Sequence, residues 1–146
     1  MNSFLTLFDV IVVLARRRFR MAERALAPLG LNHTEARLLT LLYDKGGAAP
    51  QDALASQLTV DRSNAGRALK RLERDGYIVR RKDAADKRAY VVEMAEKGGA
   101  AVAGIARLKV DMAERFFADL TEDEARAVLA LLRKALTDEE IAITAA

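Results

Sequence analysis

Apolar residues recur at intervals of three and four along the start of the chain, which predicts an amphipathic helix over about residues 3–27. The apolar stripe of this helix consists of Phe4, Phe8, Ile11, Val12, Ala15, Phe19, Ala22 and Leu26. Pro28 and Gly30 follow the stripe, and both residue types interrupt helices. The chain therefore begins with a long helix that carries one apolar face.

Two further helices are predicted next. Asn32 is a good N-terminal cap, and Glu35 three residues later completes a capping box. A pair of glycines ends this second helix. Pro50 then suits the first turn of a short third helix over residues 51–58, whose leucines face inward.

A fourth helix and a β-hairpin complete the central part of the chain. Asp61 is a good cap for the fourth helix, and Gly76 is expected to end it in the left-handed conformation. Residues 77–81 and 89–94 are rich in β-branched and aromatic residues, which favours strands. The polar residues 82–88 between them predict a turn with a charged tip.

The last third of the chain returns to helical periodicity. Residues 97–119 repeat apolar side chains, and Thr121 with Glu124 forms a capping box that starts one last helix. The whole pattern predicts a mainly α fold with a small β-hairpin wing. The predicted order is helix, helix, short helix, helix, hairpin, long helix, helix.

The composition limits the chemistry that the chain can support. It lacks Cys, which excludes disulfides, thiolate metal sites and cysteine redox chemistry. His33 is the only His, and one His with carboxylates is a poor match for zinc, so we expect no metal and no cofactor. We find no phosphate loop and no catalytic set of residues, and therefore do not expect an enzyme.

Charge is distributed unevenly along the chain. Residues 60–90 contain ten Lys or Arg and five Asp or Glu, whereas residues 91–146 contain seven and eleven. A basic block inside a patterned segment favours a polyanionic partner. The local excess of positive charge is, by itself, explained equally well by a solvated helix face.

The N-terminal apolar run does not indicate targeting to a membrane. The run from Phe4 to Ala15 precedes its basic cluster instead of following one, and it is too short to span a bilayer. We therefore expect no membrane partner. The expected location is the cytoplasm, in association with the nucleoid.

The third and fourth helices predict a helix-turn-helix, because a short helix meets a longer one through a tight turn. The fourth helix is expected to turn Ala65, Ala68, Leu69 and Leu72 inward. Its outward face carries Arg62, Ser63, Asn64, Arg67, Lys70, Arg71 and Arg74. Arg can bind guanine with two donors and Asn can pair with adenine, so this face suits the DNA major groove. The alternative is a surface helix with an ordinary basic face.

Other residues extend the expected DNA contact. Gly66 leaves no side-chain bulk on the helix, and Gln51 is expected to contact a phosphate. Lys87 and Arg88 at the hairpin tip suit the minor groove. Asp86 is expected to hold the Arg88 guanidinium through a two-pronged ion pair. The alternative is an exposed pair of little energetic value.

The residues of this central segment, in this order, resemble the MarR family of bacterial transcriptional regulators. The resemblance is carried by Gly30 to Asn32, Glu35 to Leu39, Gln51 to Leu58, Val60 to Asn64, Leu72 to Ile78, Arg80 or Arg81, Asp83, Asp86 to Arg88, and Gly98. It covers nearly the whole chain. Met94-Ala95 departs from it, because many members have Leu-Thr there, so the cap of the following helix is expected to differ.

The resemblance implies a homodimer in which terminal helices of two subunits intertwine and a winged helix-turn-helix projects from each. It divides the chain into an N-terminal dimerisation helix (1–30), a DNA-binding domain (31–96) and C-terminal dimerisation helices (97–146). It assigns major-groove recognition to residues 62–71 and minor-groove contact to the wing. The surplus of apolar residues in the terminal helices independently favours a two-fold dimer on a pseudo-palindromic operator. The alternative is that these helices complete a monomer core.

The function that we expect is sequence-specific DNA-binding transcriptional regulation, as a repressor released by a small aromatic or anionic effector. The basic residues of the first helix, Arg16, Arg17, Arg18 and Arg20, have two interpretations. They form a solvated face, which we favour, or they line an effector cleft, for which Arg16, Arg17 and Arg20 are candidates. The alternative functions are architectural, non-specific DNA binding and a winged helix used for protein contact.

Overall fold

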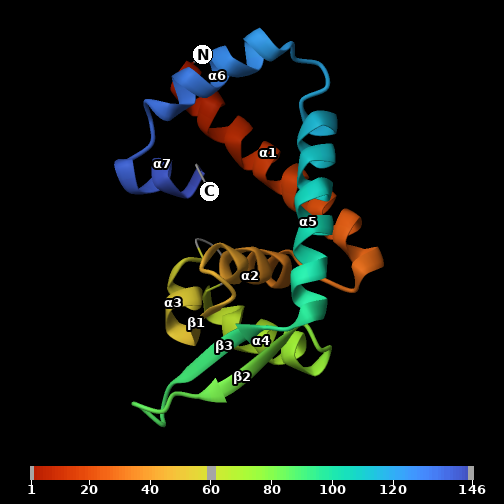
Figure 1. Cartoon of the computed structure of the whole chain (residues 1–146). Helices are drawn as coiled ribbons and strands as arrows, with labels where there is room; N and C mark the ends of the chain where they lie inside the picture. The colour runs from red at the N-terminus through yellow and green to blue at the C-terminus, as the bar shows by residue number, and fades with distance from the viewer. Residues whose placement is uncertain (1, 59–61, 145–146) are drawn as a thin grey trace. The chain divides into compact units, whose positions relative to one another are not determined.

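The computed structural model describes residues 2–58 and 62–144. The chain divides into two compact units, Met1–Met112 and Ala113–Ala146, and the boundary lies within helix α5 (Glu96–Phe116). The described residues are mainly helical with one small sheet, which confirms the predicted fold class (Figure 1). Asp61, the predicted cap of the fourth helix, lies outside the described residues.

The first unit contains the four helices that the sequence predicts before the hairpin, together with two short 3-10 helices, of which the first was not predicted. They are α1 (Ser3–Leu26), the 3-10 helix η1 (Ala27–Leu29), α2 (His33–Asp44), α3 (Gln51–Ser56), the 3-10 helix η2 (Arg62–Asn64) and α4 (Ala65–Arg74). Asn32 and Glu35 form the predicted capping box at the start of α2. Gly76 ends α4 with a φ of 83°, as predicted. The fourth helix differs in its first turn, which is a 3-10 helix.

A three-stranded antiparallel sheet replaces the simple hairpin that the sequence predicts. Strands β2 (Ile78–Lys82) and β3 (Tyr90–Met94) form the expected hairpin, whose tip projects away from the helices (Figure 1). A third strand, β1 (Ala48–Pro50), pairs with β3, so that the order is β1-β3-β2. The short β1 went unpredicted because its only buried residue is Ala49, which leaves no alternation to detect.

Helices α2, α3 and α4 and the sheet share one core. Its most deeply buried side chains are Leu38, Leu39, Leu42, Leu54, Leu69, Leu72 and Val92. Burying a side chain of this size stabilises a fold by about 1.5–3 kcal/mol. The shared core therefore holds the helix-turn-helix and the base of the hairpin as one packed body.

Helix α5 begins in close contact with the turn after α4. A Cβ at Gly98 would lie 2.3 Å from the carbonyl oxygen of Tyr77 and 2.5 Å from the sulfur of Met94, so only glycine fits there. Lys97 Nζ donates a hydrogen bond to the carbonyl of Asp75 at 2.7 Å and lies 4.2 Å from the centre of the Tyr77 ring. These contacts attach the long helix to the packed body of α2, α3, α4 and the sheet.

The second unit contains the end of α5, then α6 (Glu122–Arg133) and α7 (Asp138–Thr144). The capping box of Thr121 and Glu124 starts α6, as predicted. The prediction of a single last helix is wrong, because α7 follows it. Thr137 and Glu140 exchange the same two hydrogen bonds at the start of α7, a second capping box that the sequence contains.

The predicted apolar stripe of α1 is buried only at its C-terminal end. Ala22 and Leu26 belong to the core, whereas Phe4 is 84% exposed and Phe8 is 68% exposed. Helix α6 also exposes large apolar residues, among them Leu131 at 65%. The terminal helices therefore carry apolar surface that no other described residue covers.

Candidate nucleic-acid interface

Helix α4 has one buried face and one exposed face, as the sequence predicts. The buried residues Ala65, Ala68, Leu69 and Leu72 are each no more than 2% exposed. The exposed residues of η2 and α4 on this side, which we call the outer face of α4, are Ser63, Arg67, Lys70 and Arg74. The structure thus brings three cations and a hydroxyl together in solvent. The side chain of Arg62 lies outside the described residues.

Asn64 and Arg67 interact with each other on this helix. The Asn64 side-chain oxygen accepts a hydrogen bond from Arg67 Nη2. Asn64 is half-buried, and Arg67 is exposed. Because the bond uses one guanidinium nitrogen, the amide orients Arg67 and leaves its remaining donors in solvent.

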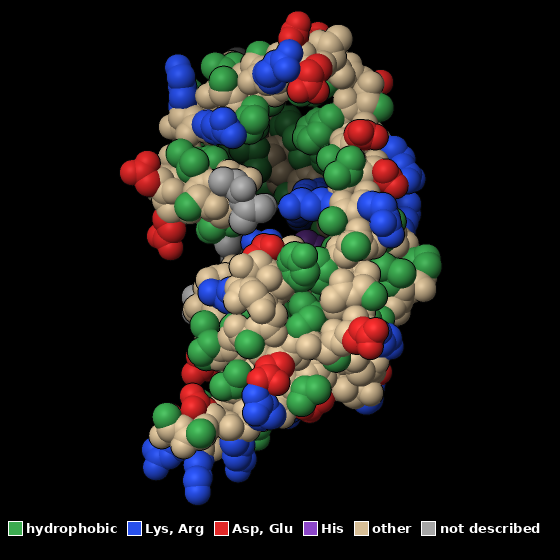
Figure 2. Space-filling view, in the orientation of Figure 1, with side chains coloured by type: hydrophobic (Ala, Val, Ile, Leu, Met, Phe, Trp, Pro, Cys, Tyr) green, Lys and Arg blue, Asp and Glu red, His purple; other side chains and the backbone are tan. Residues whose placement is uncertain are grey.

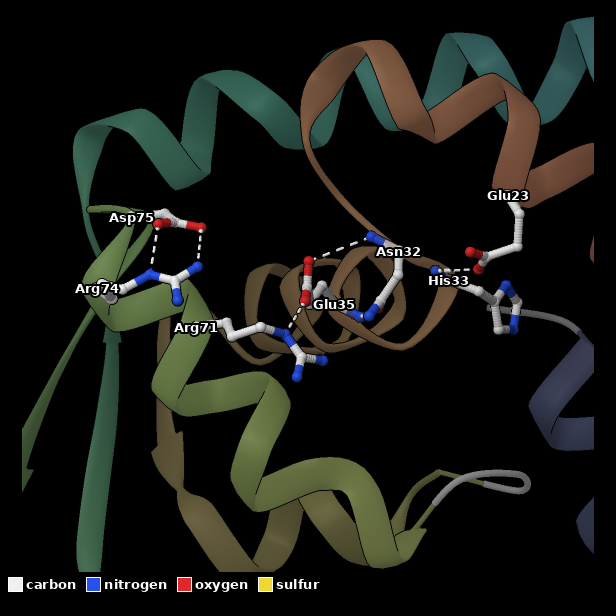
Figure 3. Close-up of polar contacts among 7 residues, drawn as sticks. All are labelled: Glu23, Asn32, His33, Glu35, Arg71, Arg74 and Asp75. Carbon is white, nitrogen blue, oxygen red and sulfur yellow. Dashed lines mark hydrogen bonds and ion pairs between the residues drawn. The ribbon is translucent and has the colours of Figure 1, made fainter.

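Arg71 differs from the other cations of α4, because its guanidinium is bound inside the protein. Arg71 Nε donates to Glu35 Oε1 of α2 at 2.6 Å (Figure 3). The Glu35 side chain is only 6% exposed, whereas Arg71 is 39% exposed. The other Glu35 oxygen accepts the backbone N–H of Asn32, within the capping box. Arg71 therefore connects α4 to the start of α2.

Gln51 lies at the start of α3, where its side chain meets the sheet. Its side-chain oxygen accepts a hydrogen bond from Arg80 Nη1 of β2 at 3.4 Å. The contact fixes the amide group. Arg80 also binds Glu73 of α4 through both its side chain and its backbone N–H.

An exposed ion pair ends α4. Arg74 Nε and Nη2 donate to the two carboxylate oxygens of Asp75 at 3.0 and 3.3 Å (Figure 3). Hydrogen bonding to Asp75 raises the pKa of Arg74 above its ordinary value, and the same contact lowers the pKa of Asp75. Both residues lie in solvent, so this pair adds little to stability.

The tip of the hairpin is organised by two aspartates. Asp83 accepts the backbone N–H of Ala85 at 2.9 Å, and Asp86 accepts the backbone N–H of Arg88 at 3.0 Å. The predicted two-pronged Asp86–Arg88 ion pair is wrong, because the carboxylate binds the backbone of Arg88 and no ion pair of the described residues joins the two side chains. Lys87 and Arg88 are exposed, and Lys and Arg side chains gather at this end of the molecule (Figure 2).

Comparisons with known proteins agree with this geometry. The sequence model of the MarR family matches residues 31–90, which contain the helix-turn-helix and the wing. The uncharacterised HTH-type transcriptional regulator YkoM of Bacillus subtilis is 33% identical over 106 residues, which are 73% of this chain and 68% of YkoM. The chain belongs to the MarR family. As a member of that family it is a DNA-binding transcriptional regulator; the family is one of regulators and not of enzymes.

Solved structures resemble this MarR-family chain over most of its length. A mutant of MarR from E. coli in complex with operator DNA superimposes with a TM-score of 0.78 at 25% identity and covers 93% of this chain and 97% of that one. The organohalide-sensing regulator RdhR with bound 2,4-dichlorophenol gives a TM-score of 0.80 at 21% identity, covering 92% and 80%. The second likeness concerns the fold alone.

The candidate effector residues of this MarR-family chain lie along α1. Arg16, Arg17 and Arg20 are exposed on that helix. Within the described ranges no group of three or more His, Asp or Glu is placed to hold a metal ion. No helix among the described residues is long and apolar enough to cross a bilayer.

The sequence did not predict the ion pairs that three charged residues of the interface form. Glu35 was predicted only as a capping residue, and Glu73 and Arg80 had no predicted role in the site. Their contacts join segments distant in sequence: Glu35 lies 36 positions from Arg71. The sequence around Glu35 predicts a helix cap, and the sequence around Arg80 predicts a strand. Neither local pattern indicates which distant residue becomes the ion-pair partner.

Proposed function

We propose that this regulator binds a pseudo-palindromic DNA operator as a homodimer and represses transcription until a small molecule releases it. The observation that carries the proposal is the outer face of α4. It presents a hydroxyl and three cations to solvent, while the opposite face of the same helix is buried in the core. A helix anchored in this way can enter the major groove while its buried face stays packed in the core.

The residues divide into base readers and phosphate contacts. In the proposed complex Arg67 binds guanine through two donors and Asn64 pairs with adenine. Arg62, Ser63, Lys70 and Arg71 complete the recognition set, and Gln51 at the start of α3 contacts a phosphate. The exposed wing residues Lys87 and Arg88 enter the minor groove, and Asp86 shapes their turn.

The exposed apolar surface of the terminal helices supports the dimer. We propose that residues 1–30 and 97–146 pair with a second copy, and that residues 31–96 form the DNA-binding domain. A C2 dimer would place two recognition helices about 34 Å apart, one turn of DNA. Because chromosomal DNA is the proposed ligand, we place the protein in the cytoplasm, associated with the nucleoid.

The dimer has a direct test on α1. Phe8→Asp introduces a charge into the apolar stripe and is expected to shift the protein to monomer in sedimentation experiments. Val13→Asp is the matched control, because Val13 is 63% exposed and helical spacing puts it on the opposite side of α1. Equal dissociation by both substitutions, or by neither, would contradict a dimer built on the Phe8 face.

DNA recognition is tested by selecting duplexes from a genomic pool and comparing the selected duplex with a shuffled one. We expect the selected duplex to bind at least about a thousandfold more tightly. Its affinity should also fall steeply with salt. Arg67→Ala and Arg88→Ala should each weaken binding. Equal affinity for both duplexes would favour architectural binding, and no effect of either substitution would favour a protein-contact role.

The effector remains a class and not a compound. RdhR was solved with a chlorinated phenol, and we propose a small aromatic or anionic molecule for this chain. Arg16, Arg17 and Arg20 are the candidate residues that would attract an anion; the alternative is that they form a solvated face. Release of the operator by a panel of aromatic acids, absent in an Arg16→Gln/Arg20→Gln variant, would support the first interpretation.

A further inference from the structure

Two ion pairs connect the recognition helix α4 to different elements of the fold. On one flank, Arg71 of α4 binds Glu35 of α2. On the other flank, Glu73 of α4 binds Arg80 of β2. The helix supplies the cation to one pair and the anion to the other. We call these contacts the α2 brace and the β2 brace.

The α2 brace is held at its inner end. Glu35 is buried, and each of its carboxylate oxygens has a separate partner: Oε1 accepts Arg71 Nε at 2.6 Å, and Oε2 accepts the Asn32 backbone N–H at 3.2 Å. The Glu35 backbone N–H donates in turn to the Asn32 side chain at 2.8 Å. The carboxylate cannot follow Arg71 without breaking the capping box, so it fixes where Arg71 lies (Figure 3).

The β2 brace is held mainly at its arginine. Glu73 Oε1 accepts Arg80 Nη2 at 3.1 Å and Nε at 3.3 Å, and Glu73 Oε2 accepts the Arg80 backbone N–H at 3.1 Å. The Arg80 side chain is 12% exposed and lies 5.1 Å from the centre of the Tyr90 ring. Its Nη1 binds Gln51, which joins α3 to the same group. This pairing between planar groups sets both position and orientation.

The two braces act on opposite flanks of α4. Residues two positions apart on a helix point about 200° apart around its axis, so Arg71 and Glu73 restrain rotation in opposite directions. Ser63, Arg67 and Lys70 lie between them on the exposed side. A rotation of about 20° would move a side-chain tip by roughly 2 Å, given a helix radius of about 6 Å with side chains. Hydrogen bonds to base edges do not tolerate such a displacement.

We propose that Glu35 and Glu73 are specificity-determining positioning residues, which lock the rotation of α4 through Arg71 and Arg80 and thereby decide which side chains meet the bases. The inference rests on the proposed function. It assigns neither glutamate a contact with DNA. Loss of a brace should therefore reduce discrimination between sequences much more than it reduces binding to DNA in general.

The test uses three variants that each remove one negative charge beside α4. Glu35→Gln keeps an amide oxygen for the capping box and Glu73→Gln keeps the shape of the side chain, but each removes the charge of one brace. Asp75→Asn is the matched control, because the Asp75 carboxylate pairs with its chain neighbour Arg74 and, within residues 2–58 and 62–144, forms no ion pair with another element. For each full-length variant, affinity is measured for the selected operator and for a shuffled duplex, below its melting temperature.

In both brace variants we expect the affinity for the operator, divided by the affinity for the shuffled duplex, to fall by about tenfold. Asp75→Asn should shift both affinities together and leave the ratio within about twofold of wild type. Wild-type ratios in both brace variants would overturn the inference. A wild-type protein that does not discriminate at all would instead overturn the proposed function.

A further variant covers the case in which Glu35→Gln or Glu73→Gln does not fold. Arg80→Lys keeps the positive charge but replaces the planar guanidinium, which binds Glu73, by a flexible ammonium that does not fix orientation. We expect this variant to melt cooperatively and to lose discrimination while its affinity for the shuffled duplex stays within about twofold of wild type. Retention of the wild-type ratio by Arg80→Lys would contradict the β2 brace.

Discussion

The hydroxyl of Tyr77 donates a hydrogen bond to the backbone carbonyl of Leu29 at 3.0 Å, across 48 positions of the chain. Tyr77 follows the recognition helix and is only 8% exposed, and Leu29 lies in η1 between α1 and α2. The bond therefore joins the region of the proposed dimer helix to the end of the DNA-reading segment.

Tyr77→Phe tests this link. The substitution removes the hydroxyl and keeps the ring, so the contact with Lys97 is retained. We expect the free energy of unfolding to fall by about 1 kcal/mol, the usual contribution of one such hydrogen bond. Urea unfolding followed by circular dichroism measures it. An unchanged midpoint would show that water replaces the hydroxyl at no cost.

Gly66→Ala should separate stability from DNA binding. A Cβ at Gly66 meets no atom within 4 Å, so alanine should stabilise α4 by about 0.5 kcal/mol through its higher helix propensity. The methyl group would occupy space beside the outer face of α4, and we expect operator affinity to fall by about tenfold. Thermal melting and operator titration measure the two effects. A stabilised variant with wild-type affinity would show that DNA does not approach there.

Gly98→Ala provides the contrast for that substitution. Its Cβ would overlap the Tyr77 carbonyl oxygen at 2.3 Å, and the neighbour is backbone that cannot move aside cheaply. This variant should melt at a lower temperature than wild type, whereas Gly66→Ala should melt at a higher one. The same substitution, glycine to alanine, should thus change the melting temperature in opposite directions at the two positions.

Asp86 is expected to strengthen DNA binding although it is negatively charged. Its carboxylate accepts the Arg88 backbone N–H and shapes the wing tip. Asp86→Ala should weaken operator binding by about fivefold, whereas simple electrostatics predicts tighter binding. Asp86→Asn keeps the acceptor without the charge and should bind at least as well as wild type. Tighter binding by the alanine variant would mean that charge outweighs turn geometry.

The capping box of α6 predicts a dependence on pH. The backbone N–H and the hydroxyl of Thr121 hold the pKa of Glu124 below its ordinary value of 4.5. A lowered carboxylate pKa stabilises the fold above pH 4.5, and that contribution disappears as pH falls through the folded-state value. Glu124→Gln does not titrate. Its melting temperature should be below that of wild type at pH 7, and the difference should shrink toward pH 3 in parallel melts; a gap that widens on acidification would contradict this assignment.

Most of the fold could be predicted from local signals. Helix caps such as Asn32 and Thr121, and the left-handed Gly76, mark boundaries by chemistry that acts within a few residues. Strand β1 could not be predicted, because Ala48–Pro50 owes its conformation to pairing with β3, more than 40 positions away. Helix α7 was missed although Thr137 and Glu140 gave a local signal, since the apolar periodicity before them suggested one continuous helix.

The candidate site was also predicted only in the features that local sequence determines. The buried and exposed faces of α4 follow from helical spacing, and the structure confirms the inward residues. The partners of Arg71 and Asp86 did not follow. A guanidinium can bind any carboxylate that the tertiary fold brings near, so neighbours in sequence, such as Asp86 and Arg88, are poor guides to which pair forms.

The strand order β1-β3-β2 leaves β1 and β2 at the two margins of the sheet. One margin ends in Pro50, which has no N–H to offer, and the other carries Arg80, Arg81 and Lys82 in succession. Margins of this kind resist hydrogen bonding to the strands of a neighbouring molecule. A protein proposed to associate with its own copy through exposed apolar helices is thereby protected from the fibrous aggregation that open strands invite.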